Sequence, residues 1–338
     1  MIKKIVLGLS TVTALMATSL IDEAKNAGLI AIPKSQSALL KLIDDVRNPI
    51  TVEKTELGKM LFFEPRLSKS GLISCNTCHN LATGGDDGLA AAVGHKWRVN
   101  PHHLGSPTVY NAVFFEKQFW DGRSPDLEDQ AQGPILAAPE MASTKEHVVK
   151  TVTSMPEYVT RFKKAYGENV KIDYKKIADT IGNFERTLVT PAPYDAYLNG
   201  DEKALSKEQK RGLKTFIDKG CVTCHNGIAL GGSMNMLGIT APYKYAKIGD
   251  FRGDSNGMVK VATLRNITQT APYFHNGQIK TLKGAIIEMG RIQLGTKISE
   301  NEAGSIEEFL KSLDGKKPKI VYPTLPSETL STPSQNIN

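Results

Sequence analysis

Apolar residues recur along much of the chain at spacings of three and four, the pattern of amphipathic α-helices. One such segment begins at Ser206, which forms a capping box with Gln209, and it ends at Gly220. Few segments alternate between apolar and polar residues with the period of a strand. The pattern therefore predicts a mainly α, loop-rich fold with few strands. Four further helices are predicted, over residues 148–166, 174–188, 282–289 and 305–313.

Stretches rich in glycine and proline separate these helices. Residues 84–94 and 100–107 are predicted to be loops, and residues 191–200 a linker. The end of the chain is rich in Pro, Ser and Thr, which predicts a disordered tail. The predicted domains are an N-terminal one over 20–195, a C-terminal one over 196–322 whose last helix is able to pack back on the first, and the tail over 323–338.

The first residues follow the pattern of a secretory signal. Lys3 and Lys4 precede an apolar run over residues 5–16, and small residues continue to Ser19. The run is too short to span a bilayer comfortably, and no later segment approaches that length. We predict a signal peptide over 1–19, with cleavage at Ala24 or an uncleaved anchor as the alternatives. The mature protein is expected to be periplasmic and not embedded in a membrane.

Composition and charge narrow the function classes. The 338 residues are 40% hydrophobic, which suffices for about two domains. The net charge of +7 is spread along the chain in mixed segments such as 207–210, as on an ordinary solvated surface. Nucleic-acid binding would require a basic stripe or arm, and the sequence has neither. Steering towards an acidic protein partner is the weaker alternative reading of this charge.

All four cysteines fall into two Cys-x-x-Cys-His motifs, so none is left for a disulfide framework. In this motif the two thiols attach to haem vinyl groups and the histidine becomes the proximal iron ligand. A zinc site would need two cysteine pairs brought together, and a redox dithiol would not need the histidine. The sequence therefore predicts two covalently bound haem c groups. The residues concerned are Cys75, Cys78 and His79 in one motif, and Cys221, Cys224 and His225 in the other.

The sequence around the two motifs repeats. A similar Gly-containing segment precedes each motif, residues 57–62 and 211–216, and an Asn and then a Gly pair follow it. We interpret this repeat as an internal duplication, giving two cytochrome c-like haem domains. Further matched pairs are Thr108 with Thr263, Asn111 with Asn266, and Glu140-Met141 with Glu288-Met289.

The distal side of each haem decides its chemistry, because a sixth ligand suits electron transfer and an open site suits activation of small molecules. Met289 lies on a predicted helix and is the candidate sixth ligand of the second haem; a core methionine is the alternative. In the first half either Glu140 or Met141 can face the iron. A carboxylate there could move a peroxide proton between the two oxygens.

Several segments together resemble the bacterial dihaem cytochrome c peroxidases, over nearly the whole mature length. The resemblance implies that such a chain reduces hydrogen peroxide to water, with electrons from a small periplasmic cytochrome c or cupredoxin. It also implies a homodimer. The matching segments are residues 74–79, 94–97, 119–123, 139–141, 263–266, 271–277 and 293–295, together with Gln130.

The resemblance implies a role for individual residues of the first half. His79 would be the proximal ligand of the peroxidatic haem, and His95 its distal ligand in the resting oxidised state. Glu140 would be the acid–base catalyst, with Gln130 positioning peroxide. A surface-loop histidine is the alternative interpretation of His95.

In the second half, His225 and Met289 would ligate the electron-transfer haem. Trp120 would lie on the electron path between the haems; a buried interface aromatic is the alternative. Two other functions stay open. One is a non-catalytic dihaem electron carrier. The other is a dihaem oxidase that forms a protein-derived quinone cofactor, a branch that carries Tyr at the position of Met289.

The family also binds a calcium ion between its domains. Two of its ligands are backbone carbonyls, which map to Thr270 and Pro272. A third is an Asn side chain, and Gly105 stands at that position here. The neighbouring His102 and His103 are a candidate metal pair, although loop histidines are the simpler interpretation.

Overall fold

The computed structural model describes residues 19–337, so the predicted signal peptide lies outside the described residues except for Ser19. The prediction of a mainly helical, loop-rich chain is confirmed. Within residues 19–337 the only sheet has two antiparallel strands, β1 (Met234–Met236) and β2 (Met258–Lys260). No helix in that range is long and apolar enough to cross a membrane.

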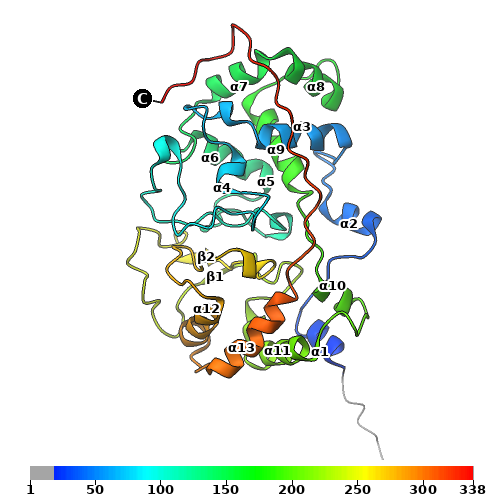
Figure 1. The fold of residues 1–338 in the computed structure, drawn as a ribbon, viewed down its shortest axis with the longest axis vertical. Coiled ribbons are helices and arrows are strands. Elements are labelled where there is room, and N and C mark those ends of the chain that lie inside the picture. The colour runs from blue at the N-terminus through cyan, green and yellow to red at the C-terminus, as the bar shows by residue number, and fades with distance from the viewer. Residues whose placement is uncertain (1–18, 338) are drawn as a thin grey trace, which may run out of the picture.

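The helices gather into an upper and a lower unit (Figure 1). The α-helices of the upper unit are α2 (Gln36–Ile43), α3 (Val52–Phe62), α4 (Cys75–Cys78), α5 (Leu127–Gln130), α6 (Gln132–Leu136), α7 (Lys145–Thr153), α8 (Pro156–Tyr166) and α9 (Tyr174–Glu185). Those of the lower unit are α1 (Leu20–Asn26), α10 (Pro193–Leu198), α11 (Lys207–Asp218), α12 (Leu282–Met289) and α13 (Glu300–Lys311). Short 3-10 helices lie at Pro65–Leu67, His95–Trp97, Ala112–Phe114, Cys221–Thr223 and Ile267–Gln269, and a π-helical turn at Gly290–Leu294.

Local sequence explains most helix boundaries. The capping box predicted at Ser206 is present, since its hydroxyl accepts from the backbone N–H of Gln209 at 3.2 Å. The helix predicted over 148–166 is instead two helices, α7 and α8. Pro156 is the first residue of α8, where its missing N–H and fixed φ are tolerated, and it cannot continue α7.

Each unit has its own buried core, but the chain does not divide between them as the sequence predicts. Ile21 and Ala24 of α1 lie in the core of the lower unit, together with Tyr194 of α10. The first helix is therefore packed against the second unit rather than the first. Both ends of the predicted first domain therefore lie in the core of the lower unit, while its middle forms the core of the upper unit.

One pair of helices crosses closely in each unit, and a glycine permits each crossing. A Cβ at Gly58 of α3 would lie under 3.0 Å from the Thr180 carbonyl oxygen of α9. A Cβ at Gly212 of α11 would lie equally close to the Ser305 carbonyl oxygen of α13. Only glycine allows backbones to approach this closely.

Two asparagines join the units at a shared threonine. Asn111 and Asn266 both have left-handed backbones, with φ of 62° and 58°. Each donates from its side-chain amide to Thr190 Oγ1, at 2.7 and 2.9 Å. All three residues are fully buried, so this junction fixes the two units relative to each other.

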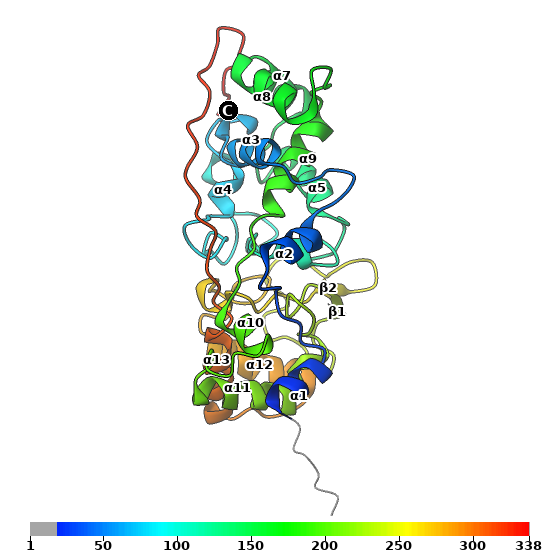
Figure 2. The ribbon, with the colours of Figure 1, turned by 90° about the vertical axis from the view of Figure 1, so that its right-hand side faces the viewer.

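The last residues return from the lower unit and run along the upper one as an extended segment (Figures 1 and 2). The Tyr322 ring lies 4.8 Å from that of Phe63, and Leu325 packs against the upper core. Thr329 Oγ1 donates to the Ser154 carbonyl at 3.0 Å. The structure thus differs from the disordered tail predicted over 323–338, because these apolar and hydroxyl groups find partners on the first unit.

Candidate haem sites

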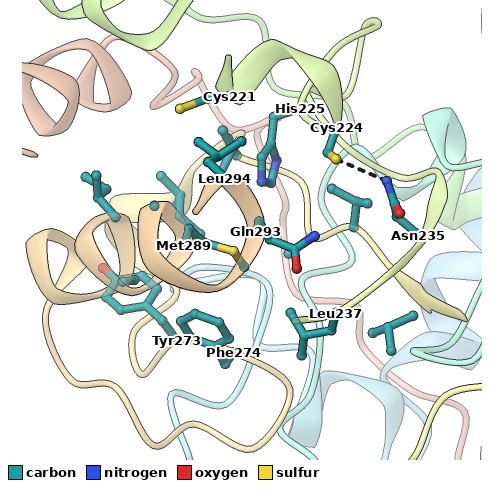
Figure 3. A pocket seen from close by; sticks show the side chains of 18 of the residues that line it. Cys221, Cys224, His225, Asn235, Leu237, Tyr273, Phe274, Met289, Gln293 and Leu294 are labelled. Carbon is teal, nitrogen blue, oxygen red and sulfur yellow. Dashed lines mark hydrogen bonds between the residues drawn. The ribbon is translucent and has the colours of Figure 1, made fainter. Parts of the chain in front are cut away.

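The second Cys-x-x-Cys-His motif opens onto an apolar cavity in the lower unit. Gly220, at φ 81°, ends α11 and turns the chain into Cys221. The cavity, counted with its opening to solvent, holds about 1170 Å³ of space not filled by protein atoms, and Cys221, Cys224, His225 and Met289 line it. Figure 3 shows the His225 ring and the Met289 thioether entering the cavity from separate elements, the motif and α12.

A backbone carbonyl orients His225. Its Nδ1 lies 3.1 Å from the Leu230 carbonyl oxygen, which leaves Nε2 for the cavity. Burial lowers the pKa of His225 and therefore favours the neutral imidazole that a metal requires. Met289, the other predicted axial residue of the second haem, has a soft thioether side chain. Its ligation of a haem iron stays a prediction.

The first motif opens onto a separate cavity, of about 900 Å³, in the upper unit. We call it the first cavity, and the cavity of the second motif the second cavity. Cys78 and His79 line it, and His79 Nδ1 lies 3.0 Å from the Pro107 carbonyl oxygen. Burial lowers the pKa of His79 as it does that of His225. The two motifs thus present the same arrangement of thiol, neutral imidazole and carbonyl.

Glu140 and Gln130 line this first cavity together with His79, as the sequence predicts for a reaction site. Gln130 ends α5, whose first turn is capped by the Asp126 carboxylate accepting from Asp129 N at 2.8 Å. Burial raises the pKa of the Glu140 carboxyl, while Arg123, which also lines the cavity, opposes that shift. The arrangement can hold a proton beside an iron-bound molecule.

His95 lies next to Glu140 but outside this cavity. Its backbone N–H donates to the Glu140 carbonyl at 2.7 Å, and its side chain is not among those lining the space. A Cβ at Gly94 would lie under 3.0 Å from the Pro139 carbonyl, so this contact requires glycine. The next residue, Lys96, has a φ of 60°. A distal-ligand role for His95 would therefore require this loop to move, and it stays a prediction.

Trp120 lies between the two cavities and lines both of them. Its indole Nε1 donates to the Gly105 carbonyl at 3.0 Å, and its ring meets that of His275 edge-on with centroids 6.4 Å apart. An aromatic held at this position is suited to conduct electrons between two bound haems. Its place on an electron path between the haems stays a prediction.

Two charged residues of these cavities are absent from the sequence predictions. Lys260 lines both cavities and Glu185 the first, and each is 5% exposed. Burial and the nearby Glu128 carboxylate raise the pKa of Glu185 to about 8. The sequence contains a signal for the burial of both residues. Glu185 shares a helix face with Ile181 and Leu188, and Lys260 stands between two valines.

The calcium prediction has no test among the described residues. They contain no cluster of three or more His, Cys, Asp or Glu side chains placed to hold a metal, and the expected ligands at Thr270 and Pro272 are carbonyls. His102 contacts the Asp250 carboxylate, with Nδ1 2.9 Å from Oδ1. This contact favours the interpretation of His102 as a loop histidine. It also lowers the pKa of the Asp250 carboxyl.

Both cavities fit a covalently attached haem. Each presents an apolar wall and an imidazole whose second nitrogen is already engaged. Both Cys221 and Cys224 line one cavity, and Cys78 lines the other. All four cysteines are free, and burial raises the pKa of Cys221 to about 11, so the thiol form is present. These are the groups that thioether formation and iron ligation require.

Known proteins share both the sequence and the fold. A family model described as di-haem cytochrome c peroxidase matches residues 52–203. The cytochrome c551 peroxidase of Pseudomonas aeruginosa is 46% identical, over 84% of this chain and 85% of that protein. The enzyme of the same name from Nitrosomonas europaea is 47% identical, over 84% and 87%.

A solved structure agrees with the fold. It is the crystal structure of a MauG-like protein associated with microbial copper homeostasis, with a TM-score of 0.69 and 24% identity. The match covers 80% of this chain and 92% of that one. At this identity the similarity concerns the arrangement of the helices alone.

Proposed function

Since this chain belongs to the di-haem cytochrome c peroxidase family, we propose that it reduces hydrogen peroxide with electrons from a small cytochrome c or cupredoxin. Peroxide takes up two electrons and two protons and leaves as two water molecules. The observation that carries the proposal is a half-buried carboxyl group, Glu140, in the same cavity as the motif histidine His79.

When bound, the haem at His79 supplies the iron that binds peroxide, and the haem at His225 and Met289 supplies the relay for electrons. The residues of the chain handle the protons. Glu140 would accept a proton from one oxygen of a peroxide bound in the cavity and return it to the other oxygen, which could then leave as water. Its burial supports this role, because a raised pKa brings the carboxyl closer to the pH at which it must both take and give a proton.

Gln130 and Trp120 complete the proposed site. The Gln130 amide can donate a hydrogen bond to a bound peroxide oxygen and so orient it. Trp120 occupies the wall common to both cavities, on the direct route for electrons. His95 would bind the first iron in the resting enzyme and leave it on activation. Its position beside Glu140, with the side chain outside the cavity, supports a removable ligand.

The proposal extends to the setting of the enzyme. We infer a periplasmic homodimer with one calcium ion at the Thr270 and Pro272 carbonyls, as the family resemblance implies. We also infer that the two units arose by duplication of one haem-binding unit. The matched helix crossings at Gly58 and Gly212 and the paired asparagines at Thr190 support that origin.

The test compares two glutamate variants of the holoenzyme. Glu140→Ala should lower peroxide turnover by roughly 10²–10⁴-fold, the usual contribution of a positioned acid–base group. Both haems should stay attached, with unchanged absorption spectra. Glu146→Ala, an exposed residue of α7, is the matched control and should turn over normally. Normal turnover in Glu140→Ala would remove Glu140 from the mechanism.

A one-electron reductive titration tests the reaction class separately. The peroxidase should give a high-spin, five-coordinate signal when the second haem is reduced, because an open iron is needed for peroxide. Two low-spin haems that persist through the titration would instead indicate an electron carrier without catalysis.

A further inference from the structure

Lys260 is a buried cation at the boundary between the two cavities. It ends β2, is 5% exposed, and is the one residue besides Trp120 that lines both cavities as the described chain forms them. Its backbone N–H donates to the Trp120 carbonyl at 2.8 Å. This bond ties the backbone of the lysine to that of the aromatic residue proposed to carry electrons.

The protein supplies no anion for the Lys260 ammonium. Across residues 19–337 it forms no ion pair, and its Nζ lies 4.8 Å above the Phe115 ring. The carboxylate with the largest effect on it is that of Asp121, which is itself engaged by Arg123 at 2.8 Å. Burial lowers the pKa of Lys260 to about 7, because no carboxylate lies close enough to stabilise the charged ammonium.

A charged group in such a place requires an opposite charge, since an unpaired buried cation is strongly unfavourable. Each cavity fits one haem, and every haem carries two propionate carboxylates. We propose that the Lys260 ammonium binds a haem propionate at the junction of the two cavities and so acts as a positioning residue for the electron path. This inference depends on the haems being bound and does not depend on which reaction they perform.

The pairing has a consequence for the haem potentials. A fixed positive charge close to a haem favours the reduced iron, which carries one positive charge fewer than the oxidised iron. Because the ammonium borders both cavities, its removal should lower the reduction potential of at least one haem. A neutral lysine that merely fills the core would leave both potentials unchanged.

The experiment uses the holoprotein and three variants. Lys260→Met removes the charge at similar length, Lys260→Arg keeps it, and Lys207→Met, on an exposed residue of α11, is the control. Haem content is measured first, and each haem is then titrated spectro-electrochemically. Lys260→Met should lower the equilibrium constant for reduction of at least one haem by about tenfold, equivalent to a potential lower by about 59 mV for one electron. Lys260→Arg and Lys207→Met should keep the original potentials, whereas unchanged potentials in Lys260→Met overturn the proposal.

A second measurement covers the case in which Lys260→Met does not fold. In a crystal structure of the unaltered holoprotein, Lys260 Nζ should lie within about 4 Å of a propionate oxygen, the range of an ion pair. An ammonium that contacts no propionate in that structure overturns the proposal. Because both measurements read potential or position, loss of peroxide turnover alone decides neither.

Discussion

The ion pair between Asp195 and Arg265 is a bidentate, buried contact of the lower unit, and its removal gives a sharp test of the structure. Arg265 is fully buried and Asp195 is 4% exposed. The guanidinium donates twice to the carboxylate, at 3.0 and 2.8 Å. The same carboxylate accepts from the backbone N–H groups of Ile32 and Ala192, at 2.7 and 2.8 Å. Four donors therefore depend on one carboxylate.

We expect Asp195→Ala to lower the free energy of unfolding by about 3–5 kcal/mol, because it leaves a buried guanidinium without its partner. Arg265→Met should destabilise the protein similarly, since it leaves the carboxylate buried and partly unpaired. The double variant should be less destabilised than the sum of the two, with a coupling energy of up to about 3 kcal/mol. The exposed i,i+4 pair of Glu157 and Arg161 is the control, and Glu157→Ala should change stability by under about 1 kcal/mol.

The assay is guanidinium denaturation of the holoprotein, followed by far-UV circular dichroism and by haem absorption. The two signals also test a local effect, because Arg265 Nε donates to the Ile228 carbonyl at 2.5 Å, in the loop that follows His225. The change in haem absorption should therefore occur at a lower guanidinium concentration in Asp195→Ala than in the control. An Asp195→Ala protein as stable as Glu157→Ala would refute the reasoning.

Three other predictions concern packing, ligation and pH. Gly212→Ala should destabilise the protein by about 1–3 kcal/mol through overlap with the Ser305 carbonyl, whereas Gly304→Ala, whose Cβ meets nothing nearer than 3.9 Å, should stabilise α13 by up to about 1 kcal/mol in the same thermal scans. Met289→Ala should lower the potential of the second haem by on the order of 0.1 V in a spectro-electrochemical titration; an unchanged potential would make Met289 a core methionine. Burial lowers the pKa of His275 to about 4, so the unfolded chain binds a proton there that the folded one does not. Roughly 3 kcal/mol of the free energy of unfolding should therefore be lost as the pH falls from 7 to 4. His275→Phe should make the free energy of unfolding depend less steeply on pH over this range.

Much of the candidate site follows from local sequence. The two Cys-x-x-Cys-His motifs specify their own chemistry because the attachment residues are contiguous. The capping box at Ser206 and the helix that carries Met289 are likewise local features, and the structure has both. The pairing of Glu140 with His79 in one cavity is not local. The internal repeat left Glu140 and Met141 as alternatives, and only the family resemblance selected Glu140.

Other features depend on contacts between distant segments, which a sequence pattern does not contain. Lysine is usually exposed, so nothing but its valine neighbours marked Lys260 as buried. The side chain of His95 does not line the cavity, and Gly94 packs closely on the Pro139 carbonyl; both features are visible only in three dimensions. The residues after 322 have the composition of a disordered tail, yet Tyr322 and Thr329 find partners on the first unit.

The returning C-terminal segment makes the order of synthesis matter. Ile320 and Leu325 complete the hydrophobic core of the upper unit, although they leave the ribosome after the whole lower unit. The upper unit is therefore unfinished until the last residues of the chain are available to pack on it, and the face that this segment covers stays open until then.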